Sequence, residues 1–413
     1  MTSEIKNQKN ESQPVKRDRI NAIDILKGFS IFWIVGYHTT QLWLIKSALW
    51  EVEMLYIFFL STVGPANFIM LSGLNLIIGI RSKSDSGWSD KRVRTQNLKR
   101  IGVLILLASI YNLGMGFIIQ NFSFIYWYDF YSWHILQTIS YSMLLTLLLF
   151  KINKYIRFFL GILVIVISYP LYSFLISLGS GGLIISHLFY YPFPDIYWSM
   201  PFFPWAGCAF MGSLIGEHLY NAKYKSEKGK NQLGKLIIYL AIMGIIFILI
   251  GIIFGSDMPS LSTPIWGFIA NFHVENLNTA YFFNFISLPY FLLPSHWTYM
   301  FYALGIDFLL LSLFIFLSDY KKFKNRVFTF FSFTGKLSFS VFIYHHFGLI
   351  LFVRTFNAFW IWPVWVGYAI LIVFIVWILV TKFEGKGTVE WLIIVLSMER
   401  KPESEDVKAP LRE

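Results

Sequence analysis

The chain has 413 residues, of which 56% are hydrophobic, 20% are aromatic and 14% are charged. A soluble domain carries about 25% charged residues, so this composition excludes an ordinary soluble protein. The net charge of +11 would suit nucleic acid, but the positions of the basic residues argue for a membrane instead. The single cysteine, Cys208, excludes an intramolecular disulfide and a cysteine-based metal cluster.

A polar and basic stretch, residues 1–19, precedes a series of long apolar runs. Apolar runs of 18 residues or more are typical of transmembrane helices. We expect one integral membrane domain, residues 20–398, followed by a polar tail, residues 399–413. The runs predict an all-α polytopic transmembrane helix bundle with about ten spans, at residues 22–44, 54–80, 99–119, 133–150, 157–178, 199–218, 233–254, 298–318, 327–350 and 360–381.

The basic residues alternate with the spans. All but four of the 34 lysines and arginines lie in the two tails or in the connections after even-numbered spans; the exceptions are Lys27, Lys46, Lys336 and Arg354. Cytoplasmic connections carry such an excess, so we expect both termini in the cytoplasm of a cell-membrane protein. The basic connections also suit the anionic lipids of the inner leaflet.

The expected outer connections differ in amino-acid composition from the basic connections. Residues 179–198 and 255–297 contain no lysine or arginine and are rich in aromatic residues and proline. Two interpretations stay open: an aromatic belt at the membrane interface, or a lid over a cavity. The longer loop is expected to lie on the outer interface or to fold back over the bundle.

The first span, residues 22–44, contains three ionisable residues, Asp24, Lys27 and His38. Such groups are costly inside a membrane and therefore indicate function. Lys27 and His38 are separated by a helical rise of about 16 Å and lie on nearly the same face, so they could hold the two ends of one long molecule. An imidazole can accept a proton or act as a nucleophile. Asp24 is expected to pair with Lys27 on the same helix.

Other polar residues in or near the spans are weaker candidates. Seven of the eight histidines fall in outer halves of spans or in outer loops: His38, His134, His187, His273, His296, His345 and His346. Asp307 lies in the middle of a span without a local partner, and Arg354 is an outer cation that either binds an anionic group or anchors the chain. We expect no metal, because adjacent His345 and His346 should point about 100° apart on a helix.

Seven segments, in order, resemble the transmembrane acyltransferase superfamily, and most closely the heparan-α-glucosaminide N-acetyltransferase catalytic domain, which is related to acyltransferase 3. Phe342 stands where tyrosine is common and Thr388 where proline is common. The first segment contains the opening motif of a basic residue and a histidine, here Lys27 and His38. The seven segments are residues 19–38, 68–83, 91–105, 133–145, 202–218, 335–346 and 383–391.

The resemblance implies transfer of an acyl group, usually acetyl from acetyl-CoA, to the sugar of an extracytoplasmic glycan or lipid-linked sugar. His38 would be the general base or a transient acyl carrier. The implied residues are His38, Asp307 and His345 for catalysis, Lys27, Arg92, Arg94, Lys99 and Arg100 for CoA, and Asn67, His134 and Arg354 for the acceptor. Membrane lipids and a homodimer are further expected partners. The alternatives are a proton-coupled transporter of a lipid-linked sugar or small solute, and a non-catalytic member that presents such a sugar.

Overall fold

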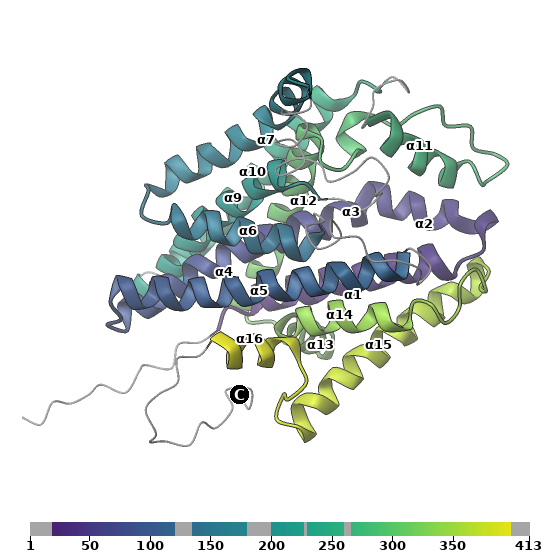
Figure 1. The fold of residues 1–413 in the computed structure, drawn as a ribbon. Coiled ribbons are helices and arrows are strands. Elements are labelled where there is room, and N and C mark those ends of the chain that lie inside the picture. Colours follow the sequence, from purple (N-terminus) through teal and green to yellow (C-terminus); the bar gives the residue numbers. More distant parts are fainter. Residues whose placement is uncertain (1–18, 120–133, 180–199, 227–228, 260–265, 398–413) are drawn as a thin grey trace, which may run out of the picture.

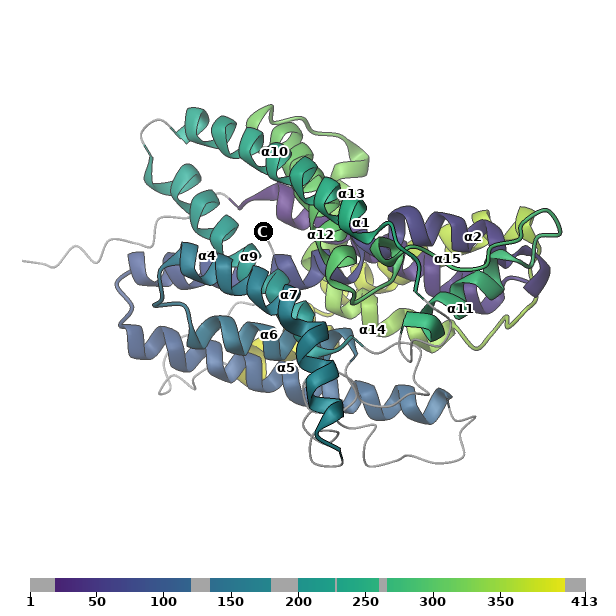
Figure 2. The ribbon, with the colours of Figure 1, turned by 90° about the horizontal axis from the view of Figure 1, so that it is seen from above.

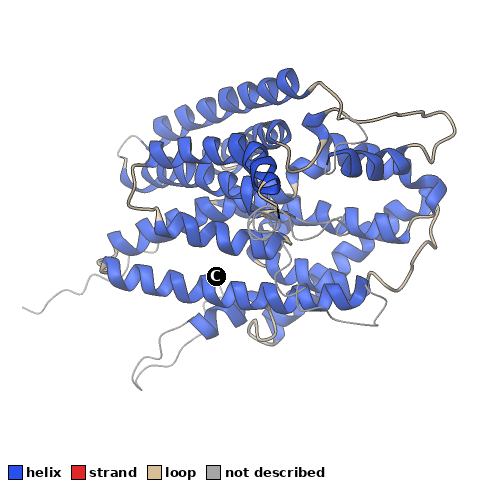
Figure 3. Cartoon of the chain, turned by 45° about the horizontal axis from the view of Figure 1, so that its top comes forward, coloured by secondary structure: helices blue, strands red, loops and turns tan. Residues whose placement is uncertain are grey.

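The computed structural model describes residues 19–119, 134–179, 200–226, 229–259 and 266–397. The expected polar tails apart from Arg19, most of the outer loop 179–198 and His187 lie outside these residues. The described residues are helical and form no strand, apart from one isolated bridge between Leu44 and Phe356 (Figure 3). The expected all-α class is therefore confirmed.

Nine helices of the described chain have 14 residues or more: α1 (Asn21–Trp43), α4 (Pro65–Asp85), α5 (Asp90–Ile119), α6 (Ile135–Leu148), α7 (Lys154–Ser177), α9 (Phe202–Tyr220), α10 (Gly229–Gly255), α12 (Trp297–Phe314) and α15 (Ala358–Lys382). Shorter helices are α2 (Leu49–Leu55), α3 (Ser61–Val63), α11 (Trp266–Leu277), α13 (Arg326–Lys336), α14 (Ser338–Gly348) and α16 (Val389–Ser397). Single turns of other helix types are η1 (Lys46–Ala48), η2 (Tyr56–Leu60), η4 (Asn221–Lys225), η5 (Tyr290–Leu292) and η6 (Ile315–Tyr320).

Each expected span coincides with a helix or a broken series of helices, but fewer pass as membrane spans. Within the described residues, five helical segments are long and apolar enough to cross a membrane: 61–85, 154–175, 229–255, 297–320 and 358–382. A sixth results if α13 and α14, bent by 85°, count as one span. Helix α1 is not among them. Most of its side chains are buried inside the bundle, so it contacts protein rather than lipid.

Burial separates central helices from peripheral ones. In the apolar windows of α7, α10 and α15 only 22–28% of the residues are buried, compared with 72% for the segment containing α4 and 67% for that containing α12. Figure 1 shows α7 and α10 along one side of the molecule and α15 along the other. The exposed apolar side chains of these three helices are suited to contact with lipid.

Glycines allow α1 to pack directly on α13. A Cβ on Gly28 would lie 1.9 Å from the Phe331 carbonyl oxygen, and one on Gly335 would lie 1.8 Å from the Asp24 carbonyl oxygen. Small residues permit such close approach of helix backbones in membrane proteins. This contact holds α1 against the α13–α14 unit, which sets the height of His38 relative to α14.

The described part of the connection 255–297 packs against the bundle, which agrees with the second of the two expected arrangements. It contains α11 and η5, and apolar residues of α11 pack with Ile57 of η2. Figure 2 shows α2 and α11 together at one end of the molecule, with the α9–α10 connection at the opposite end. The first of these is the expected outer end.

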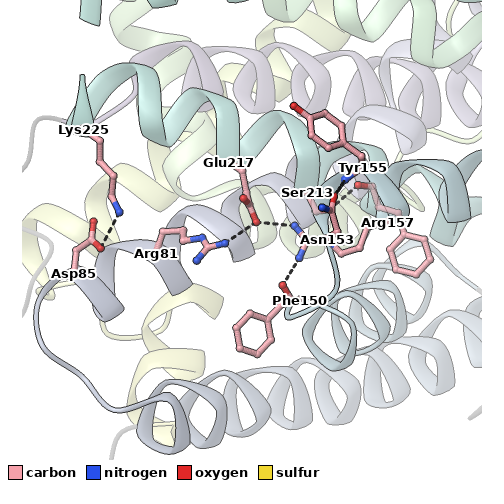
Figure 4. Close-up of polar contacts among 10 residues, drawn as sticks. Arg81, Asp85, Phe150, Asn153, Tyr155, Arg157, Ser213, Glu217 and Lys225 are labelled. Atoms are coloured by element: carbon pink, nitrogen blue, oxygen red, sulfur yellow. Dashed lines mark hydrogen bonds and ion pairs between the residues drawn. The ribbon is translucent and has the colours of Figure 1, made fainter. Parts of the chain in front are cut away.

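A buried ion-pair network joins α4, α7 and α9 at the other end (Figure 4). The Arg157 side chain is 0% exposed, and its Nη2 lies 2.8 Å from Glu217 Oε1. Arg81 Nη2 lies 3.0 Å from the same oxygen. Arg157 also donates to the Phe150 carbonyl. One carboxylate therefore compensates two guanidinium groups, one of them without access to water.

Candidate active site

Three histidines meet where α1 crosses α14. His38 Nδ1 lies 2.9 Å from His345 Nε2, and the two rings are stacked with centroids 5.2 Å apart. The His346 ring centroid lies 5.2 Å from that of His38 and 3.9 Å from that of His345. His345 and His346 are buried, whereas His38 is half-buried. The predicted catalytic pair His38 and His345 is thus brought together.

Hydrogen bonds of the cluster assign its tautomers. His345 Nδ1 lies 3.3 Å from the Val341 carbonyl oxygen, so this nitrogen carries the proton and donates it. His345 Nε2 then accepts a hydrogen bond from His38 Nδ1–H. The lone pair of His38 therefore resides on Nε2, the nitrogen that can serve as a base. A histidine that fixes the tautomer of another is comparable to the partner that orients a catalytic imidazole in other enzymes.

Tyr111 of α5 and His134 extend the cluster. His346 Nδ1 donates to the Phe342 carbonyl at 2.9 Å, and its Nε2 accepts from the Tyr111 hydroxyl at 3.0 Å. The His134 ring meets the Tyr111 ring edge-on at 6.4 Å, and His134 is close enough to His38 to interact with it electrostatically. The predicted acceptor residue His134 thus belongs to this region.

Three contacts fix the position of α14. The Trp43 indole N–H donates to the Leu349 carbonyl at 2.7 Å, and the Tyr368 hydroxyl donates to the His345 carbonyl at 2.5 Å. At the other end of α14, the Glu390 carboxylate accepts from the backbone N–H groups of Phe339 and Ser340, at 2.8 and 3.3 Å. This is a helix N-cap supplied by a different helix, α16.

Lys27 lies on the same helix as His38, toward the opposite end of α1. Its side chain is half-buried and forms no direct ion pair among the described residues. The Asp24 carboxylate attracts its charge, and Arg19 and Arg100 of α5 repel it. The expected ion pair with Asp24 is wrong. Asp24 Oδ2 lies 2.6 Å from Arg19 Nε, because Arg19 reaches back over the first turn of the helix.

The other predicted CoA residues lie along α5. Arg92 stacks over the Trp88 ring, with its Cζ 4.1 Å from the ring centroid. Arg94, Lys99 and Arg100 are exposed. Arg100 is the member of this set whose charge acts on Lys27.

Asn67, Asp307 and Arg354 form no hydrogen bond with the three histidines in the described chain. Asn67 donates to the Ser30 hydroxyl, two helical turns before His38. Asp307 is 0% exposed, and neither of its carboxylate oxygens has a hydrogen-bond partner in the described chain. Arg354 donates to the Leu44 carbonyl at 3.0 Å, at the outer end of α1.

The histidine cluster has the geometry of a possible metal site. One ligand nitrogen from each of His38, His345 and His346 lies within 4.8 Å of the others. The expectation that adjacent His345 and His346 would diverge is wrong, because their side chains converge on His38. However, His38 and His345 already hydrogen bond to each other, and both nitrogens of His346 are occupied. A bound ion would have to replace these bonds.

A small apolar cavity of about 10 Å³ lies between α4, α6 and α14. It has room for about one water molecule. Phe68, Ser338 and Phe342 contribute to its wall, and the Phe342 ring also packs against His345 and His346.

Residues 19–254 match the family model described as heparan-alpha-glucosaminide N-acetyltransferase, catalytic. The match covers more than half of the chain, and the protein belongs to this family of membrane N-acetyltransferases. A comparison with curated proteins finds no match. The matched region contains Lys27, His38 and the basic residues of α5, whereas α14 with His345 and His346 lies beyond it.

Sequence reasoning left two members of the cluster unassigned. Tyr111 gave no signal, since one tyrosine in an aromatic span is ordinary. His346 was visible as a neighbour of His345, but its direction depends on how α14 packs.

Proposed function

We propose that the protein moves an acetyl group from cytoplasmic acetyl-CoA to an amine or hydroxyl group of a sugar in an extracytoplasmic glycan or glycolipid. The observation that carries this proposal is the His38–His345 hydrogen bond, because it leaves the His38 lone pair on Nε2. A neutral imidazole at the end of a buried helix, with a lysine about 16 Å away along it, suits a long donor such as acyl-CoA.

In this mechanism His38 Nε2 removes a proton from the acceptor while the amine nitrogen or hydroxyl oxygen of the acceptor attacks the thioester carbonyl. The carbon–sulfur bond then breaks, and the imidazolium returns the proton to the CoA thiolate. His345 stabilises the imidazolium by accepting its Nδ1–H. In the second route His38 Nε2 attacks the thioester itself, becomes acetylated and passes the group to the acceptor. Trapping of an acetyl-histidine after acid quench would distinguish the two routes.

Basic residues at the cytoplasmic end would bind the CoA phosphates. Lys27 is the candidate on α1 itself: it forms no direct ion pair in the described chain, and its charge interacts with those of Asp24, Arg19 and Arg100. Arg92, Arg94 and Lys99 continue the positive charge along α5. Lysine and arginine are the usual partners of phosphate.

The acceptor would enter from the opposite end. His134 interacts electrostatically with His38, while Asn67 and Arg354 would act at other positions along α1, and Asp307 would act from the centre of the bundle. We further propose a cell-membrane protein with ten membrane crossings and both termini in the cytoplasm. It is supported by the placement of the basic residues and by the helices at all ten expected spans.

The proposed organisation is one membrane domain, residues 20–398, between polar tails 1–19 and 399–413. Lipids would cover the exposed faces of α7, α10 and α15. A homodimer through one of these faces is the remaining proposed partner.

Sealed vesicles test this proposal. Labelled acetyl-CoA is enclosed on the side of the basic loops, and an amino sugar is supplied on the other side. We expect labelled, acetylated sugar outside the vesicles, and none when donor and acceptor are exchanged between the sides. A proton-dependent flux of unmodified sugar without acetyl-CoA would instead establish the transporter alternative.

A further inference from the structure

An imidazole–carboxylate pair lies buried at the outer end of α1. The Glu53 side chain of α2 is 0% exposed and that of His273 of α11 is 6% exposed, and His273 Nδ1 bonds to Glu53 Oε1. The other carboxylate oxygen accepts from Gln41 Nε2 at 2.6 Å and from Asn276 Nδ2 at 3.1 Å. Four residues from three helices thus build one polar site.

The arrangement orients His273. A buried carboxylate is costly, and an apolar contact could join α2 to α11 at lower cost. The carboxylate fixes the orientation and the tautomer of the imidazole. His273 donates through Nδ1–H, which leaves the lone pair on Nε2. Glu53 itself is saturated by three donors and has little capacity for a ligand. The group available for chemistry is therefore His273 Nε2, with Glu53 as its positioning residue.

Aromatic rings connect this pair to the histidine cluster. Tyr37 precedes His38 and its ring lies 6.0 Å from that of His38. Tyr37 stacks on Tyr56 with centroids 3.6 Å apart, and the Tyr56 ring lies 6.0 Å from that of His273. Gln41, which bonds to Glu53, follows His38 by about one helical turn. The pair lies at the end that α2 and α11 form in Figure 2.

An amine acceptor must lose a proton before it attacks, and a base on the outer side of the protein would speed this step. An aliphatic amine is protonated at neutral pH and has no lone pair for attack. Starting from the ammonium, the balanced reaction is R–NH₃⁺ plus acetyl–S–CoA giving R–NH–acetyl, HS–CoA and one proton. His38 returns one proton to the thiolate in the proposed mechanism. The other proton must leave the ammonium before the attack.

We propose that His273 Nε2 takes this first proton from the acceptor ammonium on the outer side, with Glu53 holding the imidazole in place. The N–H bond of the ammonium breaks, its electron pair stays on nitrogen, and the proton is released from His273 to the outer solvent. Asn276 is half-buried and marks the edge of the site toward that solvent. The other titratable groups facing the pair are Tyr37 from α1 and Tyr56 from η2, which both sense the Glu53 charge.

This inference rests on the proposed function. Two acceptor substrates with different amine pKa values distinguish a failure of the inference from a failure of the proposed function. At about pH 6 a methyl glucosaminide is protonated, whereas O-methylhydroxylamine is a weak base and largely neutral. We expect Glu53→Gln and His273→Asn to slow acetylation of the glucosaminide by about 10–100-fold. The same variants should acetylate O-methylhydroxylamine at nearly the wild-type rate, which also reports that they are folded. At about pH 9, where the amine has lost its proton, the difference between the glucosaminide rates should shrink.

His296→Asn is the matched control. His296 is another buried outer histidine, but it caps α12 through Thr298 and should not discriminate between the acceptors. Equal losses for both acceptors in Glu53→Gln would overturn the inference and assign the pair a structural role. If His38→Ala leaves both rates unchanged, the proposed function fails instead.

Discussion

His38 Nδ1 lies 2.9 Å from His345 Nε2, although 307 positions separate the two residues in the chain. The contact depends on two packing features that no single motif encodes. Gly28 and Gly335 bring α1 against α13, and the 85° bend after α13 turns α14 toward the outer part of α1. The first histidine lies within the region matched by the family and the second lies beyond it.

The role of His345 can be measured without altering His38. His345→Ala removes the acceptor of the His38 Nδ1–H bond and should lower kcat about 10–100-fold, with little change in the KM for acetyl-CoA. His345→Gln can place an amide oxygen near Nδ1 and should lose less. His218→Gln, a histidine of α9 at the opposite end, serves as the control. Equal losses in the two His345 variants would contradict an orienting role.

The absence of a metal requirement is a separate prediction. The ring nitrogens of His38, His345 and His346 already form hydrogen bonds with each other, with Tyr111 and with backbone carbonyls. We therefore expect acetyl transfer to continue after treatment with a strong zinc chelator. Elemental analysis of the purified protein should find well under one equivalent of zinc. Loss of activity on chelation, with recovery on adding Zn²⁺, would establish a three-histidine metal site instead.

Removing one partner of the Arg157–Glu217 pair should strongly destabilise the fold. Glu217→Ala leaves the fully buried Arg157 guanidinium without its carboxylate, and such a change costs about 3–5 kcal/mol. Lys151→Ala is the matched control, since its pair with Asp90 is exposed by 67% and 65% and should contribute at most about 1 kcal/mol. Thermal unfolding in detergent measures both. Similar melting temperatures for the two variants would contradict the importance of burial.

The stability difference between the wild-type protein and Glu390→Gln should depend on pH. Burial raises the pKa of the Glu390 carboxyl above its ordinary value. The charged form is therefore penalised in the folded state, and stability relative to Glu390→Gln should be greatest at low pH and fall as the pH rises through the raised pKa. Melting temperatures of the two proteins across an acidic to neutral series test this. A difference that grows with pH would show that the cap to Phe339 and Ser340 requires the charge.

Much of the architecture follows from local pattern. Helices form at all ten expected spans because apolar runs of that length must satisfy their backbone polar groups internally. The all-helical class and the membrane character needed no knowledge of packing. The number of crossings follows less directly from pattern alone, because α1, α5, α6 and α9 do not pass as membrane spans by length and composition in the described chain.

The site was predictable only in part. His38 and Lys27 stand out because ionisable residues in a span are rare, and the helix preserves their spacing. The convergence of His345 and His346 on His38 required the bend of α14, and the Glu53–His273 pair required α11 to fold back onto α2. The Asp24 ion pair was assigned to the wrong partner because local spacing favoured Lys27 over Arg19, which lies just before the helix.

The most direct test is acetyl transfer by His38→Ala in sealed vesicles, with labelled acetyl-CoA on the side of the basic loops and amino sugar on the other. Binding of acetyl-CoA should stay within about twofold of wild type, because Lys27 and α5 are untouched. Transfer should fall by at least about 10²-fold, the usual contribution of a general base. Transfer at the wild-type rate in a variant that binds acetyl-CoA normally would contradict the assignment of His38 as the catalytic residue.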